Sequence, residues 1–411
     1  MSDDWLPDDI RLVRDSVIRF METEIVPKMD AVESSGVFPR DLIGVCGGAG
    51  FYGAVFPEAV GGTDLGYLAA AVISEEMARL DTRFAACNNQ QGSTCPFTIY
   101  SAGTEEQVAR FVPNLLAGKT IGMFSLTEPG GGSDAAGNMK TTAVRDGDVY
   151  RLNGSKMWAS MSNETDVGVL FAKTDPDAGH RGITAFIVEP KKYAGFEARP
   201  IPMMGLSNAL RTCAVFLDDF IVPVENRLGE EGEGFKIAMH GLQAGRVTVA
   251  AKALGIARAC LDEAVRYAND RTVRGAALGS FQMVQADIAD MATNIEASRM
   301  MVYRAAMLMD EGRHSNRLTS MAKYHASVTA KHAADKAQQI FGGYGMAAEY
   351  RISWLKSYAD LFFTGEGSAN VQRILIAEDA LGYKDADRHR GSTRFRDPAQ
   401  ARLARAKQEK N

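Results

Sequence analysis

The spacing of apolar residues changes twice along this 411-residue chain, and that change constrains the fold more than any other feature. From about Pro7 to Gly118 the apolar residues recur three and four positions apart, which predicts helices. From about 119 to 234 they alternate, which predicts strands, and from about 235 to 383 the helical spacing returns. A chain of this length can bury a large core and divide into two or three folding units. We therefore expect an α+β protein with domains at 1–118, 119–234 and 235–383, followed by a polar tail at 384–411.

The middle segment carries the signals of a mostly antiparallel, barrel-like β domain. Asp146 and Gly147 separate two short alternating runs, and a glycine there accepts the positive φ of a tight hairpin turn. Further strand candidates, each bounded by Gly, Pro or Asp, are the runs VGVLFAK at 167–173, ITAFIVEP at 183–190 and TCAVFLDDFIV at 212–222.

The third segment reads as a bundle of four helices, at 245–271, 281–312 and 318–343 and in the run after Ser368. In the first helix one face is apolar, and in the second a series of methionines is typical of core filling rather than of a cofactor site. The residues of that apolar face are Val247, Ala251, Leu254, Leu261, Val265 and Ala268, and the methionines are Met291, Met300, Met301, Met307 and Met309.

Composition excludes several classes of function. The net charge of −5 provides no general basic field for nucleic acid. Five scattered cysteines without a C-x-x-C pair predict buried, reduced thiols, and six histidines without an H-E-x-x-H pattern give no metal site. The acidic N-terminus lacks the apolar core of a signal peptide, and no apolar run approaches about 18 residues, so we expect a cytoplasmic protein without a membrane span. The tail at 384–411 has nine Lys/Arg and four Asp/Glu, which predicts a solvated or partly helical segment, with partner contact as the alternative.

Two glycine-rich segments need separate interpretations. GGAGFYG (47–53) matches the dinucleotide fingerprint formally, but that motif works only between a strand and a helix, and the preceding PRDLIGVCG reads as a helix. We interpret it as a helix-to-loop break. In FSLTEPGGGSDAAG (124–137), glycines without Cβ atoms let backbone N–H groups approach a flat or anionic ligand, although a plain surface turn has the same composition. Trp158, about thirty residues later, could stack on a ring system or belong to the core.

Glu366 lies between Gly365 and Gly367, just before an apolar-periodic run that Ser368 can cap at its start and Gly382 at its end. One interpretation is electrostatic, because an acid before a helix start gains about 0.3–1 kcal/mol from the helix dipole. Capping, however, does not require a glycine on both sides of the acid. The alternative is a carboxylate that a ligand can approach closely.

Taken together, the motifs give the chain a close resemblance to the acyl-CoA dehydrogenase family of flavoenzymes over about Leu6 to Leu381. The residues that carry it, in order, are FPEAVGG (56–62), LTEPGGGSD (126–134), LNGSKMWAS (152–160), GEEGEGFK (229–236), GRVTVAAKALG (245–255), FQMVQADIADM (281–291), QIFGGYG (339–345) and EGSANVQR (366–373). The resemblance implies a helical domain, a β domain and a four-helix bundle, in agreement with the apolar spacing.

The resemblance also implies roles by position. Glu366 is the implied base that removes the α-proton of an acyl-CoA thioester, while N5 of a bound FAD accepts the β-hydride. Arg246, Ser133 and Gly367 are implied to lie near the thioester, and electrons are implied to pass to an electron-transferring flavoprotein. The residues implied to contact FAD are Phe124, Leu126, Thr127, Gly132, Ser133, Trp158, Ser160, Ser368 and Asn370, with Arg271, Gln282, Gln339, Gly342 and Gly343 reaching the FAD of a neighbouring subunit in a dimer of dimers.

Three positions depart from the family pattern, and alternatives stay open. Gly365 stands where a tyrosine is common, Arg274 replaces an aromatic residue, and Ser357-Tyr358 replaces Arg-Asp. Gly245 occupies the position where some members carry the base, so Glu366 is the aligned candidate here. The alternatives are a dehydrogenase of acyl-carrier-protein thioesters, a flavin oxidase or monooxygenase on the same fold, and a non-catalytic helical assembly protein.

Overall fold

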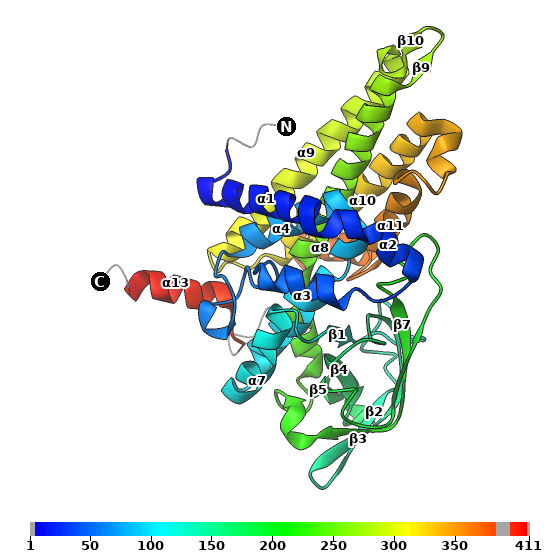
Figure 1. Cartoon of the computed structure of the whole chain (residues 1–411). Coiled ribbons are helices and arrows are strands. Elements are labelled where there is room, and N and C mark those ends of the chain that lie inside the picture. Colours follow the sequence, from blue (N-terminus) through cyan, green and yellow to red (C-terminus); the bar gives the residue numbers. More distant parts are fainter. Residues whose placement is uncertain (1–4, 384–394, 409–411) are drawn as a thin grey trace.

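The computed structural model describes residues 5–383 and 395–408, and Figure 1 shows three parts arranged along one long axis. A bundle of long helices forms one end, a β-sheet forms the other, and shorter helices from the N-terminal part cross between them. The N-terminal helices are α1 (Asp8–Phe20), α2 (Val26–Ser35), α3 (Arg40–Gly48), α4 (Tyr67–Ala85), α5 (Asn88–Gly92), α6 (Thr94–Ala102) and α7 (Glu105–Leu116). Helix α3 runs directly into GGAGFYG, so the interpretation of that motif as a helix-to-loop break is confirmed.

The middle part is one mixed sheet whose strands follow the order β6-β7-β3-β2-β4-β5-β8. Most pairs are antiparallel, as predicted, but β1 and β2 each pair with β4 in parallel. The predicted hairpin is present, with Asp146 opposite Val149 and Gly147 at φ +60°. The strands are β1 (Gly122–Ser125), β2 (Thr142–Asp146), β3 (Val149–Ser160), β4 (Val167–Lys173), β5 (Ile183–Val188), β6 (Phe196–Pro200), β7 (Thr212–Pro223) and β8 (Arg227–Leu228).

The C-terminal bundle is built around α8, which is longer than predicted because its 37 residues begin at Gly234. A helix that we did not predict, α11, separates α10 from the final helix of the bundle. The bundle helices are α8 (Gly234–Asp270), α9 (Gln282–Asp310), α10 (Asn316–Phe341), α11 (Ile352–Thr364) and α12 (Ala369–Ala380), and the short strands β9 (Thr272–Val273) and β10 (Ala276–Ala277) join α8 to α9.

Two details of the predicted core are wrong. Val265 is 37% exposed, and Met300 and Met307 are 41% and 39% exposed, whereas Met291 and Met309 are buried. The reason is visible in Figure 1, where α9 lies on the outside of the bundle and the ends of α8 and α9 project beyond the other helices. Within residues 5–383 and 395–408 no element covers these faces, so the apolar periodicity continues beyond the part of each helix that is packed.

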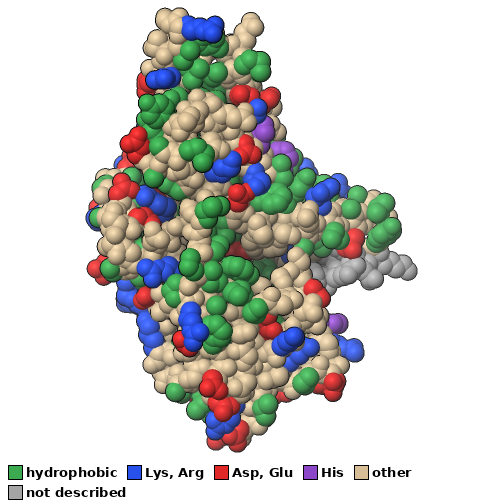
Figure 2. Space-filling model, turned by 90° about the vertical axis from the view of Figure 1, so that its right-hand side faces the viewer, with side chains coloured by type: hydrophobic (Ala, Val, Ile, Leu, Met, Phe, Trp, Pro, Cys, Tyr) green, Lys and Arg blue, Asp and Glu red, His purple; other side chains and the backbone are tan. Residues whose placement is uncertain are grey.

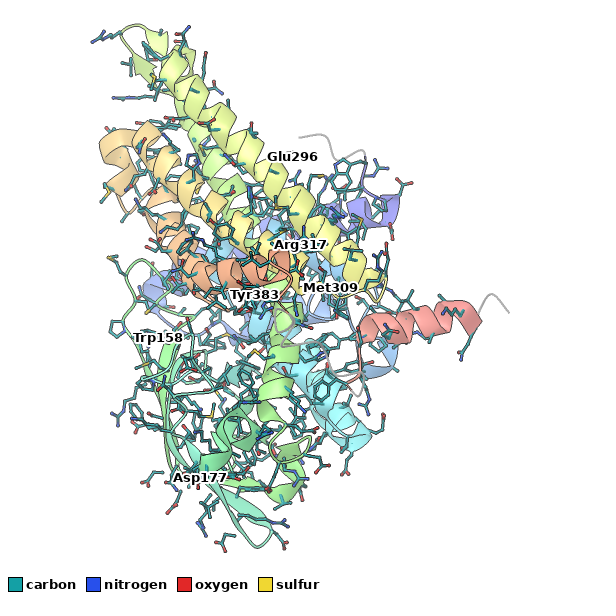
Figure 3. All side chains as sticks on the ribbon, turned by 180° about the vertical axis from the view of Figure 1, so that it is seen from behind. Trp158, Asp177, Glu296, Met309, Arg317 and Tyr383 are labelled. Atoms are coloured by element: carbon teal, nitrogen blue, oxygen red, sulfur yellow. The ribbon has the colours of Figure 1, made fainter. Side chains whose placement is uncertain are left out.

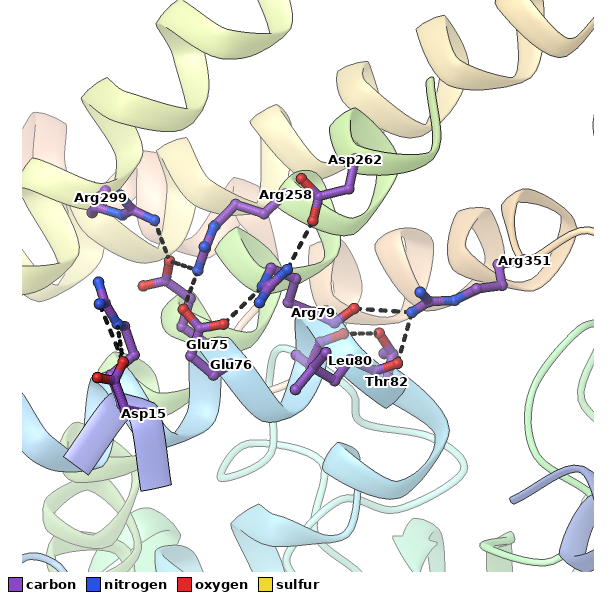
Figure 4. A network of polar contacts seen from close by, with 12 residues as sticks. Asp15, Glu75, Glu76, Arg79, Leu80, Thr82, Arg258, Asp262, Arg299 and Arg351 are labelled. Atoms are coloured by element: carbon purple, nitrogen blue, oxygen red, sulfur yellow. Dashed lines mark hydrogen bonds and ion pairs between the residues drawn. The ribbon is translucent and has the colours of Figure 1, made fainter. Parts of the chain in front are cut away.

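A buried ion-pair network joins the N-terminal part to the bundle (Figure 4). Glu75 on α4 is fully buried, and its Oε1 lies 2.7 Å from Arg258 Nη1 on α8 and 2.9 Å from Arg299 Nη2 on α9. Tyr303 Oη donates to the other carboxylate oxygen of Glu75 at 2.6 Å. The adjacent Glu76 also contacts Arg258, at 2.6 Å. Three helices from distant parts of the sequence are therefore held together by charge at their buried junction.

The last described segment is helix α13 (Pro398–Gln408), which extends sideways from the body in Figure 1. Arg402 pairs with Asp310 at 2.6 Å, and Arg405 pairs with Asp64. Arg396, just before the helix, pairs with Glu105 at 2.6 Å. The tail is therefore partly helical, as predicted, and contacts this chain's own surface, while 384–394 lie outside the described residues.

In the part of the chain that the structure describes, no helix combines the length and apolar character that a membrane crossing requires.

Candidate active site

Glu366 occupies the short link between α11 and α12 with an unusual backbone conformation. Its φ is +51°, a region that non-glycine residues rarely adopt and that costs about 1–3 kcal/mol unless the surroundings impose it. Gly367 follows at φ +85°, so its lack of a Cβ is needed for the turn itself. Gly365, in contrast, is extended at φ −73°. The backbone turn therefore explains why residue 367 is a glycine, but it does not explain the glycine at 365.

The two carboxylate oxygens of Glu366 differ in their surroundings. Oε1 accepts a hydrogen bond from Nδ2 of Asn89, which lies on the short helix α5. Oε2 is buried and has no hydrogen-bond partner among the described residues. A Cβ placed on Gly245 would lie 2.8 Å from Oε2, so the free oxygen faces the backbone of α8. One oxygen is thus held and the other is available.

The pKa of Glu366 is raised, chiefly because burial disfavours the charged carboxylate. Three buried cations act in the opposite direction, namely Lys252 and Arg246 on α8 and Lys323 on α10. Burial in turn lowers their own pKa values, to about 8 for each lysine and about 10 for the arginine. The site therefore combines a buried carboxylate with a surrounding positive field that favours its ionised form.

The glycine-rich loop after β1 lies against β3. Met157 N donates to Thr127 O at 2.9 Å, which brings the loop next to Trp158. Lys156 is fully buried and pairs with Glu128 at 2.8 Å, and burial lowers the pKa of its ammonium to about 8. Glu128 also accepts from the backbone N–H groups of Lys140 and Thr141. The loop is therefore anchored at its base, while Gly132 and Ser133 at its tip are exposed.

Trp158 is not a core residue. Its φ is +63° and its side chain is 52% exposed, at the end of the sheet that faces the helices (Figure 3). Ser160 follows two residues later on the same strand. On β1, Phe124 packs against Phe171 with ring centroids 5.1 Å apart, and Leu126, directly after β1, is buried. The glycine-rich loop beside this exposed indole leaves open space, because a Cβ on Gly130 or Gly132 would meet nothing within 4 Å. An exposed indole next to such a loop fits the flat ring system of a flavin.

A second group of predicted residues lies elsewhere. Arg271 precedes β9, at the end of the bundle farthest from the sheet in Figure 1, and its guanidinium lies 5.9 Å from the ring of Tyr344. Within one chain these residues do not meet Trp158. The others, all exposed, are Gln282, Gln339, Gly342 and Gly343.

The residues after Glu366 begin α12. Ser368 caps this helix, since its Oγ accepts from Val371 N at 3.4 Å, and Asn370 is exposed in the first turn. The predicted N-cap is confirmed. Figure 2 shows apolar side chains gathered at mid-height on one face of the molecule, between the bundle above and the sheet below.

Sequence reasoning missed the residues that hold the carboxylate. Asn89 gave no signal, because it lies in a polar run whose packing partner is about 277 positions away. Lys252 did give one, since a lysine within the otherwise apolar run VAAKALGIA is unusual on a buried helix. Lys323 on α10 is also fully buried, but its neighbours include Tyr324 and His325, so its surroundings in the sequence carried no comparable signal.

Comparison with known proteins defines the class of the chain. Residues 7–119, 123–220 and 232–381 match the N-terminal, middle and C-terminal domains of acyl-CoA dehydrogenases. The glutaryl-CoA dehydrogenase of Desulfococcus multivorans is 38% identical over 387 residues, which cover 93% of this chain and 99% of that protein. Subunit CarC of the caffeyl-CoA reductase–Etf complex of Acetobacterium woodii is 38% identical over 367 residues, covering 89% and 96%.

Among solved structures, a glutaryl-coenzyme A dehydrogenase in complex with glutaryl-CoA superposes with a TM-score of 0.89 at 38% identity, covering 93% of this chain and 97% of that one. The chain is thus a flavoprotein oxidoreductase of the class that acts on CH–CH groups. It belongs to the acyl-CoA dehydrogenase family.

Proposed function

We propose that this protein removes the α-proton and the β-hydride of an acyl-CoA thioester, with Glu366 as the base and FAD as the cofactor. The observation that carries the proposal is the state of Glu366: its backbone φ is strained, its Oε1 is tethered to Asn89, and its Oε2 is buried without a hydrogen-bond partner among the described residues. A surface acid that only favours a helix start would need none of these features.

The surroundings of Glu366 suit proton abstraction from carbon. A thioester α-C–H is a weak acid, so the base has to be strong and correctly placed. Burial raises the pKa of Glu366 and strengthens it as a base, while Lys252, Lys323 and Arg246 favour the ionised form that is able to accept a proton. Oε2 is the atom that takes the proton, because Oε1 is occupied by Asn89.

The other proposed roles are those that membership of the family implies for these positions. Phe124, Leu126, Thr127, Gly132 and Ser133 would form one wall of the FAD site, with Trp158 and Ser160 opposite and with Ser368 and Asn370 at the start of α12. The flavin, when bound, supplies the hydride acceptor. Arg246, Ser133 and the backbone at Gly367 would orient the thioester, whose carbonyl oxygen needs donors as it gains negative charge.

Two proposals concern partners. Because a 38% identical relative is named as a subunit of an Etf complex, we propose that electrons leave this protein to an electron-transferring flavoprotein. Because Arg271, Gln282, Gln339, Gly342 and Gly343 are exposed, with Arg271 at the far end of the bundle, we propose that they complete the FAD site of a second copy, within a dimer of dimers. We further propose that the enzyme works in the cytoplasm.

The first test is spectroscopic. The purified protein should be yellow, or become yellow when FAD is added, and an anaerobic panel of acyl-CoA thioesters should include one that bleaches the flavin band. Acyl-carrier-protein thioesters in the same panel distinguish the two carrier types. A protein that stays colourless with FAD, or a flavin that no thioester of either type bleaches, would refute the proposed function.

A second test addresses the space beside Oε2. Gly245→Ala places a methyl group 2.8 Å from the position of Oε2, so the carboxylate has to move. Alanine is a better helix former than glycine, and α8 should persist. We expect kcat/KM to fall about 10²-fold, as for a displacement of a reacting group by a fraction of an ångström to 1 Å. Gly48→Ala on α3, where a Cβ would meet nothing within 4 Å, is the control and should leave kcat/KM unchanged. Equal activity of both variants would show that Oε2 does not lie where the base acts.

A further inference from the structure

The hydrogen bond that holds Glu366 is itself held by a buried lysine. Asn89 Oδ1 accepts from Lys252 Nζ and, at 3.2 Å, from Thr248 Oγ1. An ammonium group has donors only, so the side of the Asn89 amide that faces Lys252 must be its oxygen. The amide NH₂ group is therefore turned toward Glu366, where Nδ2 donates to Oε1.

The chain of contacts runs from α8 through α5 to the link before α12. Lys252 is fully buried, Asn89 is 3% exposed, and Thr248 lies one turn before Lys252 on the same helix. Gly245, seven positions before Lys252, lies on the same face and borders the free oxygen Oε2. Helix α8 thus contributes both the residue that fixes the tether and the bare backbone beside the reactive oxygen.

We propose that Lys252 and Asn89 are positioning residues for the base, Lys252 fixing the orientation of the Asn89 amide and Asn89 holding Oε1 so that Oε2 alone meets the substrate. The proposal rests on the proposed role of Glu366 and adds to it two residues whose contact with the carboxylate is direct for Asn89 and relayed for Lys252. Among the described residues, Asn89 Oδ1 is the one hydrogen-bond acceptor of the Lys252 ammonium, and the ring of Phe362 lies 6.0 Å from it. Orienting Asn89 is therefore the role that these contacts give to Lys252.

The same arrangement has an electrostatic consequence. The charged groups that act on Glu366 are Lys252 and Arg246 from α8 and Lys323 from α10, and the thiol of Cys87, before α5, acts on Lys252. Of these cations Lys252 has the strongest influence on the pKa of Glu366, in the lowering direction. Removing its charge should therefore raise that pKa, which means that the carboxyl stays protonated up to a higher pH.

Three variants separate geometry from charge. Lys252→Gln keeps a donor for Asn89 Oδ1 and removes the charge, Asn89→Ala removes the tether and keeps the charge, and Thr248→Val removes only the second, neutral donor. The readout is the protonated-carboxyl band of Glu366, taken from the infrared difference between each FAD-loaded protein and the same protein carrying Glu366→Gln, measured against pH. The second readout is the pH profile of kcat/KM with the best thioester of the panel.

We expect Lys252→Gln to shift the infrared midpoint and the acid limb of the kcat/KM profile to higher pH, with activity recovering as the pH is raised. Asn89→Ala should lose about 10²-fold in kcat/KM at every pH, because the tether is absent in both ionisation states. Thr248→Val should leave the infrared midpoint in place. An unshifted midpoint in Lys252→Gln, or a Thr248→Val shift of the same size, would overturn the assignment of Lys252.

The two proposals fail in different ways. If the carboxyl band shifts as expected but no thioester bleaches the flavin, then the network is correct and the proposed function is wrong. If thioesters bleach the flavin in a Glu366-dependent way but Asn89→Ala and Lys252→Gln both behave as the wild type, then the proposed function stands and the positioning role is wrong.

Discussion

Glu366→Gln is expected to leave the protein folded and yellow while slowing anaerobic flavin bleaching by about 10²–10⁴-fold, the usual contribution of a positioned general base. The substitution keeps the size of the side chain, and the amide oxygen of a glutamine can still accept from Asn89 Nδ2 as Oε1 does now. What the glutamine lacks is a basic oxygen at the position of Oε2. Stopped-flow absorbance of the flavin band, with the best thioester of the panel, measures the effect.

The stability of the same variant provides an independent control on the pKa of Glu366. Because burial raises the pKa of this carboxyl above its unfolded value, the folded wild type binds the extra proton, and its free energy of unfolding falls as pH rises between the unfolded and folded pKa values. Glu366→Gln does not titrate. Urea unfolding should therefore show the variant gaining stability relative to the wild type as pH rises through that window, and an opposite trend would contradict the assigned direction.

Much of the fold could be predicted because it depends on local spacing. Apolar periodicity indicated the helical, β and helical segments, and Asp146-Gly147 indicated the β2–β3 hairpin. The unpredicted helix α11 has its buried residues Ile352, Leu355, Ala359 and Phe362 at regular helical spacing, so the sequence carried a signal for this helix that our prediction did not use. The prediction for Val265 failed because its apolar spacing is regular but no element among the described residues fully covers that part of α8.

The candidate site could be predicted only for residues that stand out from their immediate neighbours in the sequence. Glu366 between two glycines and Trp158 in its strand are visible in a few residues of sequence. Asn89 lies 159 positions from Thr248 and 163 from Lys252, and their meeting depends on how α5 packs against α8. The strained φ of Glu366 and of Trp158 is likewise a tertiary property, because no neighbouring residue requires it.

The largest expected change in stability comes from Glu75. Replacing it with alanine removes the carboxylate that Arg258 and Arg299 share in the junction of α4, α8 and α9 (Figure 4). The same substitution removes the acceptor of the Tyr303 hydroxyl. Breaking a buried ion pair from one side costs about 3–5 kcal/mol, since the remaining charge stays buried and uncompensated. For a domain of ordinary stability this is a large part of the total free energy of unfolding, about 5–15 kcal/mol. Urea unfolding of the FAD-loaded protein at fixed concentration measures the loss.

A matched surface variant isolates the effect of burial in this prediction. Glu24→Ala removes an exposed partner of Lys28, at 3.1 Å on the N-terminal helices, and should change the free energy of unfolding by less than about 1 kcal/mol. A loss of similar size in Glu24→Ala and Glu75→Ala would show that burial does not set the cost.

The double variant Glu75→Met with Arg299→Met should recover part of the stability lost in Glu75→Ala, because apolar side chains of similar volume avoid leaving a buried charge. Recovery in the double variant, with none in Glu75→Met alone, is the result that assigns the cost to the unpaired charge and not to the cavity.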